Sequence, residues 1–160
     1  MAENKKIKGA TAVTYKNINF RSKFEERVYK KLISLGYNPE YELEHFVLWE
    51  GFRPQKEYYY NGIPENTKKK DPITCKMTVL TDKPEALQSW RYTPDFLLRM
   101  NGFAFYVEAK GHPNDLWPYK KKLFLKVIEN IPKTYFFEVR SIKGLLASLE
   151  VMKKISNTNE

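Results

Sequence analysis

Two carboxylates and a lysine stand in unusual places in the segment RYTPDFLLRMNGFAFYVEAKGH, residues 91–112. Asp95 and Glu108 each interrupt a strand-like apolar run, and Lys110 follows Glu108 by two residues. Carboxylates that share a partly buried face repel each other, so one takes up a proton unless a cation lies between them. Hard cations such as Mg²⁺ bind carboxylate oxygens. A carboxylate pair, a cation and a lysine together are suited to hydrolysis of a phosphodiester.

The Asn101-Gly102 pair predicts the hairpin that would bring these residues together, because Asn-Gly between strand-like runs is a strong hairpin signal. A two-residue loop places Asp95 directly opposite Glu108, with Cβ atoms roughly 4.5–5.5 Å apart. Lys110 then lies on the same face, and the other face carries a core-like set, namely Phe96, Leu98, Phe103, Phe105 and Val107. A bulge would shift this register, and the alternative interpretation is two surface carboxylates on an exposed sheet face.

A helix is predicted in residues 22–37, upstream of the hairpin. Ser22 is a suitable N-cap and Gly36 a suitable stop. Apolar residues recur at helical spacing and form one stripe, consisting of Phe24, Val28, Leu32 and Leu35.

The remaining pattern predicts an α/β fold, a mixed sheet flanked by helices. We expect strands in 39–52 and 134–139 and helices in 115–130 and 141–155, with Pro118 tolerated in a first helical turn. The predicted organisation is a basic flexible arm at 1–18, one domain at 19–156 with an insertion at about 53–90, and a tail at 157–160. The insertion is expected to hold an Asn61-Gly62 turn and a strand near 77–80.

The formal net charge of +9 indicates a polyanionic partner, either nucleic acid or an acidic membrane surface. Cys75 is the sole cysteine, which favours a reducing compartment. The first twenty residues lack an apolar signal core, and no apolar run approaches the length of a membrane span. We therefore expect a soluble cytoplasmic protein without a small-molecule cofactor.

The stretch TPDFLL followed by VEAKG resembles the PD-(D/E)xK nuclease signature. More narrowly, three segments resemble the phage T7 endonuclease I family of Holliday-junction resolvases: FRSKFEERVYKKLISLGYNPEYE, the hairpin, and WPYKKKLFLKVIENIPKTYFFEV. The resemblance implies a restriction endonuclease-like core, one or two Mg²⁺ or Mn²⁺ ions, and cleavage of branched DNA by a homodimer. It also implies a phage-encoded protein that acts in a host cell.

The resemblance assigns roles to single residues. Asp95 and Glu108 match the metal-binding carboxylates, Lys110 the catalytic lysine, Glu25 the acidic residue of the first helix, and Glu40 an accessory glutamate. The hairpin is longer here than in that family. The segment 43–90 is also longer, and it stands where the family links the halves of a strand-swapped dimer.

Glu25 has a second interpretation, because Ser22 and Glu25 have the spacing of a capping box. Lys120, Lys121 and Lys122 are candidates for contacts with DNA phosphate, as is Arg21, although a charge run is more often a solvated face. His45 and His112 lack the spacing of zinc ligands, and Tyr58–Tyr60 are either a strand or a surface for base stacking.

The predicted function is a metal-dependent DNA endonuclease that prefers branched DNA. A nuclease of the same superfamily that acts on linear duplex or single strands is the alternative among enzymes. A non-catalytic basic DNA-binding protein is the alternative from another class, and it would leave the opposed carboxylates unexplained.

Overall fold

The computed structural model describes residues 11–56, 59–60, 62–64, 68–69, 79–80, 86–111 and 115–158. The chain divides into two compact units, one formed by Met1–Phe46 with Tyr92–Glu160 and the other by Val47–Arg91. The predicted roles or turns of residues 1–10, Tyr58, Asn61, Cys75 and His112 lie outside the described residues.

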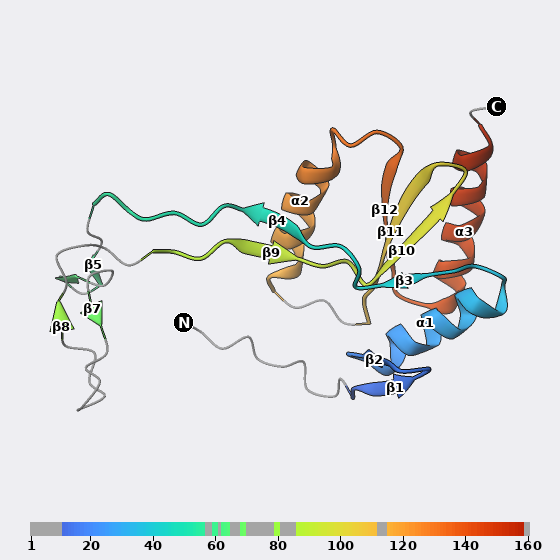
Figure 1. Ribbon diagram of the computed structural model, residues 1–160, viewed down its shortest axis with the longest axis horizontal. Helices are drawn as coiled ribbons and strands as arrows, with labels where there is room; N and C mark the ends of the chain where they lie inside the picture. The colour runs from blue at the N-terminus through green and yellow to red at the C-terminus, as the bar shows by residue number, and fades with distance from the viewer. Residues whose placement is uncertain are drawn as a thin grey trace. The chain divides into compact units, whose positions relative to one another are not determined.

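A four-stranded mixed sheet is the centre of the first unit (Figure 1). Its strand order is β12 (Thr134–Val139), β11 (Phe103–Ala109), β10 (Phe96–Met100) and β3 (Glu40–Tyr41). β11 runs parallel to β12, whereas β10 runs antiparallel to both β11 and β3. The predicted α/β class with a mixed sheet is therefore confirmed.

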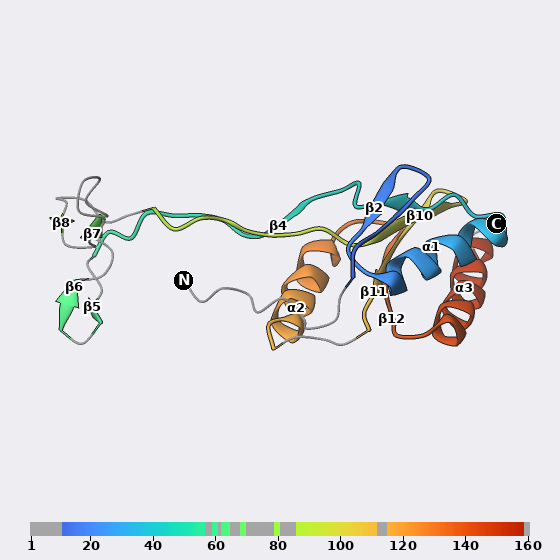
Figure 2. The ribbon, with the colours of Figure 1, turned by 90° about the horizontal axis from the view of Figure 1, so that it is seen from below.

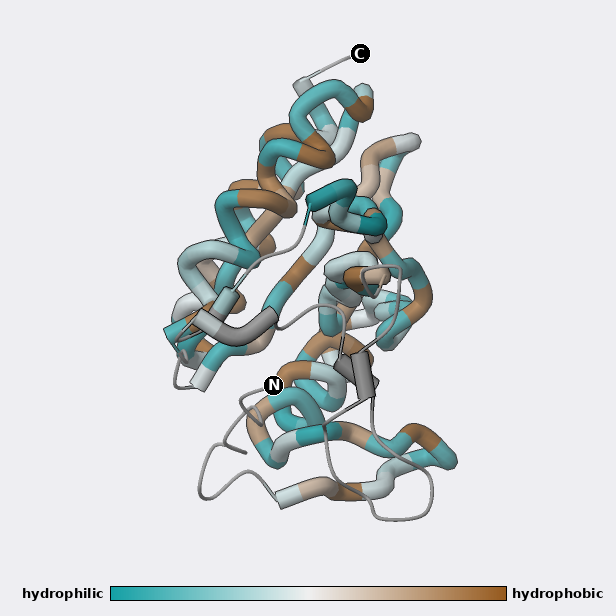
Figure 3. The backbone as a smooth tube through the Cα atoms, turned by 90° about the vertical axis from the view of Figure 1, so that its left-hand side faces the viewer, coloured by the Kyte–Doolittle hydropathy of each residue, from teal (hydrophilic) through white to brown (hydrophobic). Residues whose placement is uncertain are grey.

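Helices cover both faces of this sheet (Figure 2). α1 (Lys23–Ser34) and α3 (Ile142–Asn157) pack on one face, where Val28, Leu32 and Leu145 join the apolar side of the hairpin in one buried cluster. α2 (Trp117–Ile128) packs on the other face, where Phe124 lies against Tyr106 and Phe136. Figure 3 shows apolar and polar segments alternating along α3, as expected for a helix with one buried face.

The hairpin has the predicted two-residue loop. Asn101 and Gly102 have φ of 48° and 78°, the left-handed values that a type I′ turn requires. Met100 pairs with Phe103, and the register continues to Phe96 opposite Val107 without a bulge. The apolar side of the hairpin is buried as predicted.

α1 begins as predicted, with the Ser22 Oγ accepting a hydrogen bond from the Glu25 amide at 3.2 Å. The predicted apolar stripe is wrong at its end, because Leu35 is the C-cap residue and is 44% exposed. The helix stops there since Gly36 has a φ of 84°, which ends the helical path. The buried face of α1 includes Tyr29, which was not part of the predicted stripe.

Two strands lie on the N-terminal side of α1, and the first of them precedes the predicted domain boundary at residue 19. β1 (Val13–Tyr15) and β2 (Ile18–Phe20) form a hairpin. Phe20 is buried, and its ring lies 4.7 Å from that of Tyr41. The expectation of a flexible arm is therefore wrong for residues 13–18, where aromatic packing fixes the chain.

The second unit, Val47–Arg91, contains the predicted insertion. Its pieces are short: β4 (Phe46–Trp49) pairs with β9 (Trp90–Tyr92), β5 (Tyr59–Tyr60) with β6 (Ile63–Pro64), and β7 (Lys68–Lys69) with β8 (Val79–Leu80). The strand predicted over 39–52 is two strands, β3 and β4, separated by a turn.

Gly51 is needed in this unit. A Cβ at Gly51 would lie 2.7 Å from the Leu87 carbonyl oxygen, closer than two such atoms can approach. The backbones of Phe52 and Leu87 exchange two hydrogen bonds beside this point, at 3.0 and 2.8 Å. The absence of a side chain therefore lets the two chain segments meet.

Candidate active site

Asp95 lies at the mouth of the hairpin, one residue before β10. Its side chain is 7% exposed and follows the buried Pro94. Oδ2 of Asp95 accepts a hydrogen bond from the Ala109 amide at 2.7 Å. The carboxylate thus continues the strand pairing by one step, and this bond fixes it beside the end of β11.

Glu108 is the buried carboxylate of β11, the strand between β10 and β12. Its residue is 3% exposed. Oε2 accepts a hydrogen bond from the Tyr92 hydroxyl at 2.6 Å, and Oε1 lies 2.7 Å from Nζ of Lys110. Both carboxylate oxygens therefore have a donor, one of them a cation.

Lys110 lies just beyond the end of β11. Its amide donates to the Val139 carbonyl at 2.8 Å, which extends the pairing with β12 and fixes the backbone. Nζ lies 4.5 Å from the centre of the Trp117 ring, and the side chain is 24% exposed. The ammonium group is therefore held between Glu108 and an aromatic face and still reaches solvent.

Glu25 is buried in the first turn of α1 and has three hydrogen-bond donors. Oε1 accepts from the Ser22 Oγ at 2.7 Å, and Oε2 accepts from the Arg21 amide at 3.0 Å and from the Tyr41 hydroxyl at 2.7 Å. This is a variant of the capping box, in which the glutamate reaches the amide before the N-cap residue. The Ser22 cap is therefore present, but Glu25 bonds to the Arg21 amide and the Ser22 hydroxyl instead of the Ser22 amide of a standard capping box.

The three acidic residues also interact electrostatically. Burial raises the pKa of Asp95 well above its ordinary value, and the charges of Glu108 and Glu25 raise it further. Such a site gains from a cation, which would remove the repulsion between the carboxylates. The donor set consists of carboxylate oxygens, the ligands that Mg²⁺ and Mn²⁺ prefer.

The acidic side chains are not arranged as a closed metal cage. Within the described part of the chain, no three Asp, Glu, His or Cys side chains converge closely enough to hold a metal ion together. Asp95 and Glu108 therefore fit an ion that has few protein ligands and keeps several waters, as Mg²⁺ does.

Glu42 is an acidic neighbour that the sequence did not reveal. Its amide donates to the Asp95 carbonyl at 2.9 Å, and its Oε1 lies 2.8 Å from Nε of Arg21. Burial raises the pKa of Glu42, and the charges of Glu25 and Glu108 add to the effect. The backbone of Glu42 has a φ of 47°, a left-handed conformation that is costly for a residue with a side chain.

Glu40, the predicted accessory residue, is not brought to this cluster. Its Oε1 lies 3.1 Å from Nε of Arg99, whose Nη2 lies 2.8 Å from Glu44. Tyr106 donates to the other oxygen of Glu44. Strand alternation explains the separation, because Glu40 and Tyr41 point to opposite faces and Tyr41 faces Glu25.

The predicted DNA-binding cations differ in their surroundings. Lys120 is half-buried, and its pKa is lowered by burial and by the charges of Lys110 and Arg21, so these three cations lie near one another. Lys121 instead forms an ion pair with Glu138 at 3.0 Å. Lys122 is exposed on α2.

Trp117 and Tyr92, which the sequence analysis did not single out, pack against the residues of the site. Trp117 is 3% exposed, its Nε1 donates to Oε2 of Glu138 at 3.1 Å, and its ring lies 5.9 Å from that of Tyr92. Burial would raise the pKa of Glu138, but hydrogen bonds from Lys121, Arg140 and Trp117 lower it overall. Trp117 therefore contacts Lys110 directly, and it contacts Tyr92, the residue that donates to Glu108. An RYTPD segment with a Tyr three residues before the Asp was the available signal for Tyr92.

None of the described helices combines the length and apolar character that crossing a membrane requires. Comparisons with protein-family models, with curated proteins and with solved structures find no match to this chain.

Proposed function

We propose that this protein is a metal-dependent DNA endonuclease with a restriction endonuclease-like core of the PD-(D/E)xK type. The observation that carries the proposal is the convergence of Asp95, Glu108 and Lys110 at the end of one hairpin. Two carboxylates are buried there side by side, and the lysine Nζ lies 2.7 Å from one of them. An arrangement that only stabilised the fold would not place a second buried acid where its charge raises the pKa of Asp95.

Asp95 and Glu108 would hold one or two Mg²⁺ or Mn²⁺ ions, and Glu25 would add its negative charge to theirs without converging with them as a third ligand. When bound, the cation polarises a phosphoryl oxygen and lowers the pKa of a bound water. The chain's own residues do the rest. Tyr92 and the Ala109 amide orient the two carboxylates, and Glu138 restrains the Trp117 ring that packs on Lys110.

Lys110 would stabilise the charge that develops on the phosphate. The reaction is attack of a water oxygen on phosphorus, with breakage of the bond between phosphorus and the 3′ oxygen. The water loses its proton and the leaving 3′ oxygen gains one. The products are a 5′-phosphate and a 3′-hydroxyl, as the resemblance implies.

The proposed substrate is branched DNA, cut by a homodimer in the cytoplasm of a host cell. The net charge of +9 supports a nucleic-acid partner. The choice of branched DNA depends on the resemblance of the first helix and the hairpin to junction-resolving enzymes.

Cleavage of a labelled four-way junction in Mg²⁺, compared with EDTA, tests the proposal. Asp95→Asn and Glu108→Gln should abolish cleavage and leave DNA binding intact or stronger, because they remove a negative charge close to the phosphate. Glu44→Gln is the matched control, since it removes the charge of a carboxylate that contacts Arg99 and Tyr106 instead of Asp95, Glu108 or Lys110. Cleavage by either site variant at near the wild-type rate would exclude this site.

The same experiment tests the other candidates. A protein that binds junctions and never cuts them in Mg²⁺ or Mn²⁺ is a basic DNA-binding protein. Metal-dependent cleavage of linear duplex or single strands, at the rate found for junctions, indicates a nuclease of the same superfamily with a different substrate.

A further inference from the structure

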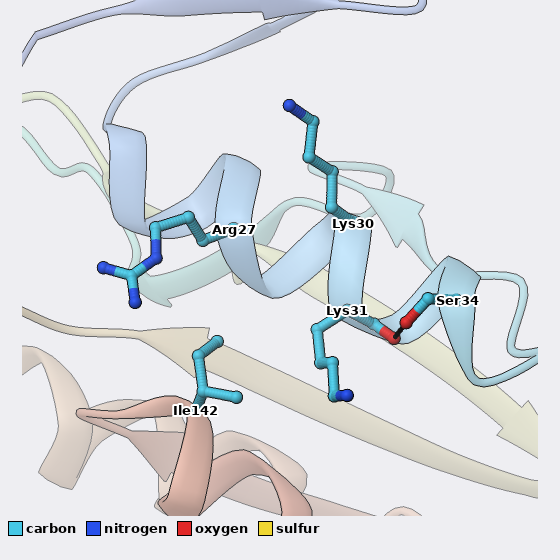
Figure 4. A pocket seen from close by; sticks show the side chains of 5 residues that line it. All are labelled: Arg27, Lys30, Lys31, Ser34 and Ile142. Carbon is cyan, nitrogen blue, oxygen red and sulfur yellow. Dashed lines mark hydrogen bonds between the residues drawn. The ribbon is translucent and has the colours of Figure 1, made fainter.

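A second basic feature lies on α1, on the side away from Glu25. A shallow depression, open to solvent and of about 370 Å³, is lined by five residues, Arg27, Lys30, Lys31, Ser34 and Ile142, and is called the hollow below. Figure 4 shows the side chains of Arg27 and Lys31 extending on the side of Ile142, the first residue of α3, whereas Lys30 extends the other way. The Ser34 Oγ donates to the Lys31 carbonyl at 2.8 Å.

The three positively charged side chains of the hollow, Arg27, Lys30 and Lys31, differ in whether a nearby carboxylate neutralises their charge. Lys30 lies 2.6 Å from a carboxylate oxygen of Glu26, and its Nζ lies 4.3 Å from the centre of the Tyr15 ring. Arg27 and Lys31 form no ion pair with any residue of the described ranges. They stand four residues apart on one helix, a spacing at which like charges repel. Two uncompensated cations on one wall of a hollow indicate an anionic ligand.

The position of Arg27 and Lys31 on α1 determines which phosphates of a bound DNA they can contact. Successive residues of an α-helix are about 100° apart, so Arg27 lies about 200° around α1 from Glu25. The pair therefore faces away from the carboxylates. A phosphate held by Arg27 and Lys31 is not the one that would be cut at Asp95 and Glu108.

We propose that Arg27 and Lys31 bind backbone phosphates of a DNA segment outside the cleavage point, which in a branched substrate is a second arm. The inference rests on the proposed function, because DNA is the polyanion that it supplies. A guanidinium group pairs with phosphate through two parallel hydrogen bonds. A lysine one helical turn away, with Cβ atoms about 5–6 Å apart, can reach a neighbouring phosphate of the same strand. The net charge of +9 favours DNA, an extended polyanion, over an acidic protein.

The test is the salt dependence of binding, measured on a labelled four-way junction in EDTA so that no cleavage occurs. Each phosphate contact contributes about 0.9 to the slope of log K against log salt, so Arg27→Gln with Lys31→Gln should flatten the slope by about 1.8. The same double variant should raise the junction concentration needed for half-maximal cleavage and leave the rate at saturation unchanged. Circular dichroism checks that the variant is folded.

Lys153→Gln with Lys154→Gln is the charge-matched control, because it removes two exposed positive charges from α3 away from the hollow, of which Lys153 is already paired with Glu150. It should change the slope little. A wild-type slope for the Arg27 and Lys31 variant, or an equal flattening by the control, would overturn the proposal. So would a wild-type protein that does not bind DNA. Since the slope is measured without cleavage, it is independent of the Asp95→Asn result that tests the nuclease proposal.

Discussion

The hydroxyl of Tyr92 donates a 2.6 Å hydrogen bond to Oε2 of Glu108, and the bond is buried. Burial raises the pKa of Tyr92 far above its ordinary value, and the Glu108 charge raises it further, so the phenol stays protonated and remains a donor. Tyr92 thus orients one oxygen of the proposed metal-binding carboxylate in the manner of an outer-shell partner.

Tyr92→Phe should lower metal-dependent cleavage about 10–100-fold, the usual range for removal of an outer-shell partner. The ring is retained, so its packing against Phe124 and Trp117 persists. The concentration of Mg²⁺ needed for half-maximal cleavage should rise, because Glu108 is no longer held in one orientation. Both quantities are measured in a Mg²⁺ titration.

Tyr106→Phe is the matched control for this prediction. Tyr106 is also a buried tyrosine whose hydroxyl donates to a glutamate, but its partner is Glu44. Its loss should reduce stability without changing the Mg²⁺ requirement. Equal effects of the two variants on the Mg²⁺ requirement would show that Tyr92 acts only through the fold.

Asp95→Asn should stabilise the metal-free protein at neutral pH, by the order of 1 kcal/mol, as often happens when a strained functional group is removed. The folded state raises the pKa of Asp95 above 3.8, the ordinary value that the unfolded chain retains. The folded state therefore binds the proton more tightly. Protonated Asp95 therefore contributes fully to stability below its pKa in the unfolded chain, and this contribution is lost as the pH rises through its raised pKa in the folded protein.

Thermal melting of both proteins in EDTA, between about pH 4 and pH 8, checks this sign. The melting temperature of the wild type should fall relative to that of Asp95→Asn as the pH rises. Added Mg²⁺ should raise the melting temperature of the wild type much more than that of the variant, because only the wild type keeps both carboxylates. An identical pH dependence in the two proteins would contradict the prediction.

Glu25 combines a cap with a place beside Asp95, and two substitutions separate these roles. Ser22→Ala should cost about 0.5–2 kcal/mol of stability, the usual range for an N-cap, and leave the cleavage rate of the folded protein unchanged. Glu25→Gln keeps an oxygen that can accept from Tyr41 or Ser22, so it should melt near the wild-type temperature and cleave slowly. Retained cleavage with reduced melting in Glu25→Gln would assign this residue to the cap alone.

The hairpin could be predicted because its information is local. Asn101-Gly102 specifies a type I′ turn, and with the loop length known, period-2 alternation places Asp95, Glu108 and Lys110 on one face. The start of α1 was equally local, since Ser22 and Glu25 carry the capping signal themselves. The register predicted that Lys110 shares a face with Glu108, and the structure adds the ion pair between them.

Glu42 and Glu40 show what the sequence could not reveal. Alternation alone places them on one face, but Glu42 adopts a left-handed backbone that is rare for glutamate, and its side chain turns to Arg21. Only the tertiary contact with Asp95 makes that conformation tolerable. Trp117 is also beyond local reasoning, because its contact with Tyr92 joins α2 to β9, an element that is remote in sequence.

Lys110→Ala should reduce the cleavage rate at least about 10²-fold, the scale for loss of one preorganised electrostatic partner. Lys110→Arg should also be slow, because a guanidinium is planar and larger than an ammonium and does not place its charge at the same point. Single-turnover rates at saturating DNA measure the chemical step. Lys121→Ala is the control, since Lys121 is also a lysine in an ion pair with a glutamate, but its partner is Glu138 and not Glu108. A fully active Lys110→Arg would reduce Lys110 to a surface charge.

The last prediction concerns the substrate and the oligomeric state. Symmetric cleavage of two strands at a junction is most simply achieved by a symmetric dimer, so we expect a homodimer that prefers four-way junctions. The unit Val47–Arg91 stands in sequence where the resembling enzymes connect the halves of their dimer. It either lengthens that connection or folds back on its own chain, and the second case leaves a monomer that cuts flaps or nicks with less selectivity.

Competition decides between the two cases. A labelled four-way junction is cleaved in the presence of excess linear duplex of the same sequences, at several salt concentrations. Phosphate contacts weaken for both substrates as salt rises, so a preference that persists reflects recognition of the branch, and one that vanishes reflects charge alone. Equal inhibition by duplex and junction competitors, together with a monomeric mass in solution, would remove the junction-resolving assignment. The nuclease assignment would stand, because it depends on Asp95, Glu108 and Lys110 within one chain.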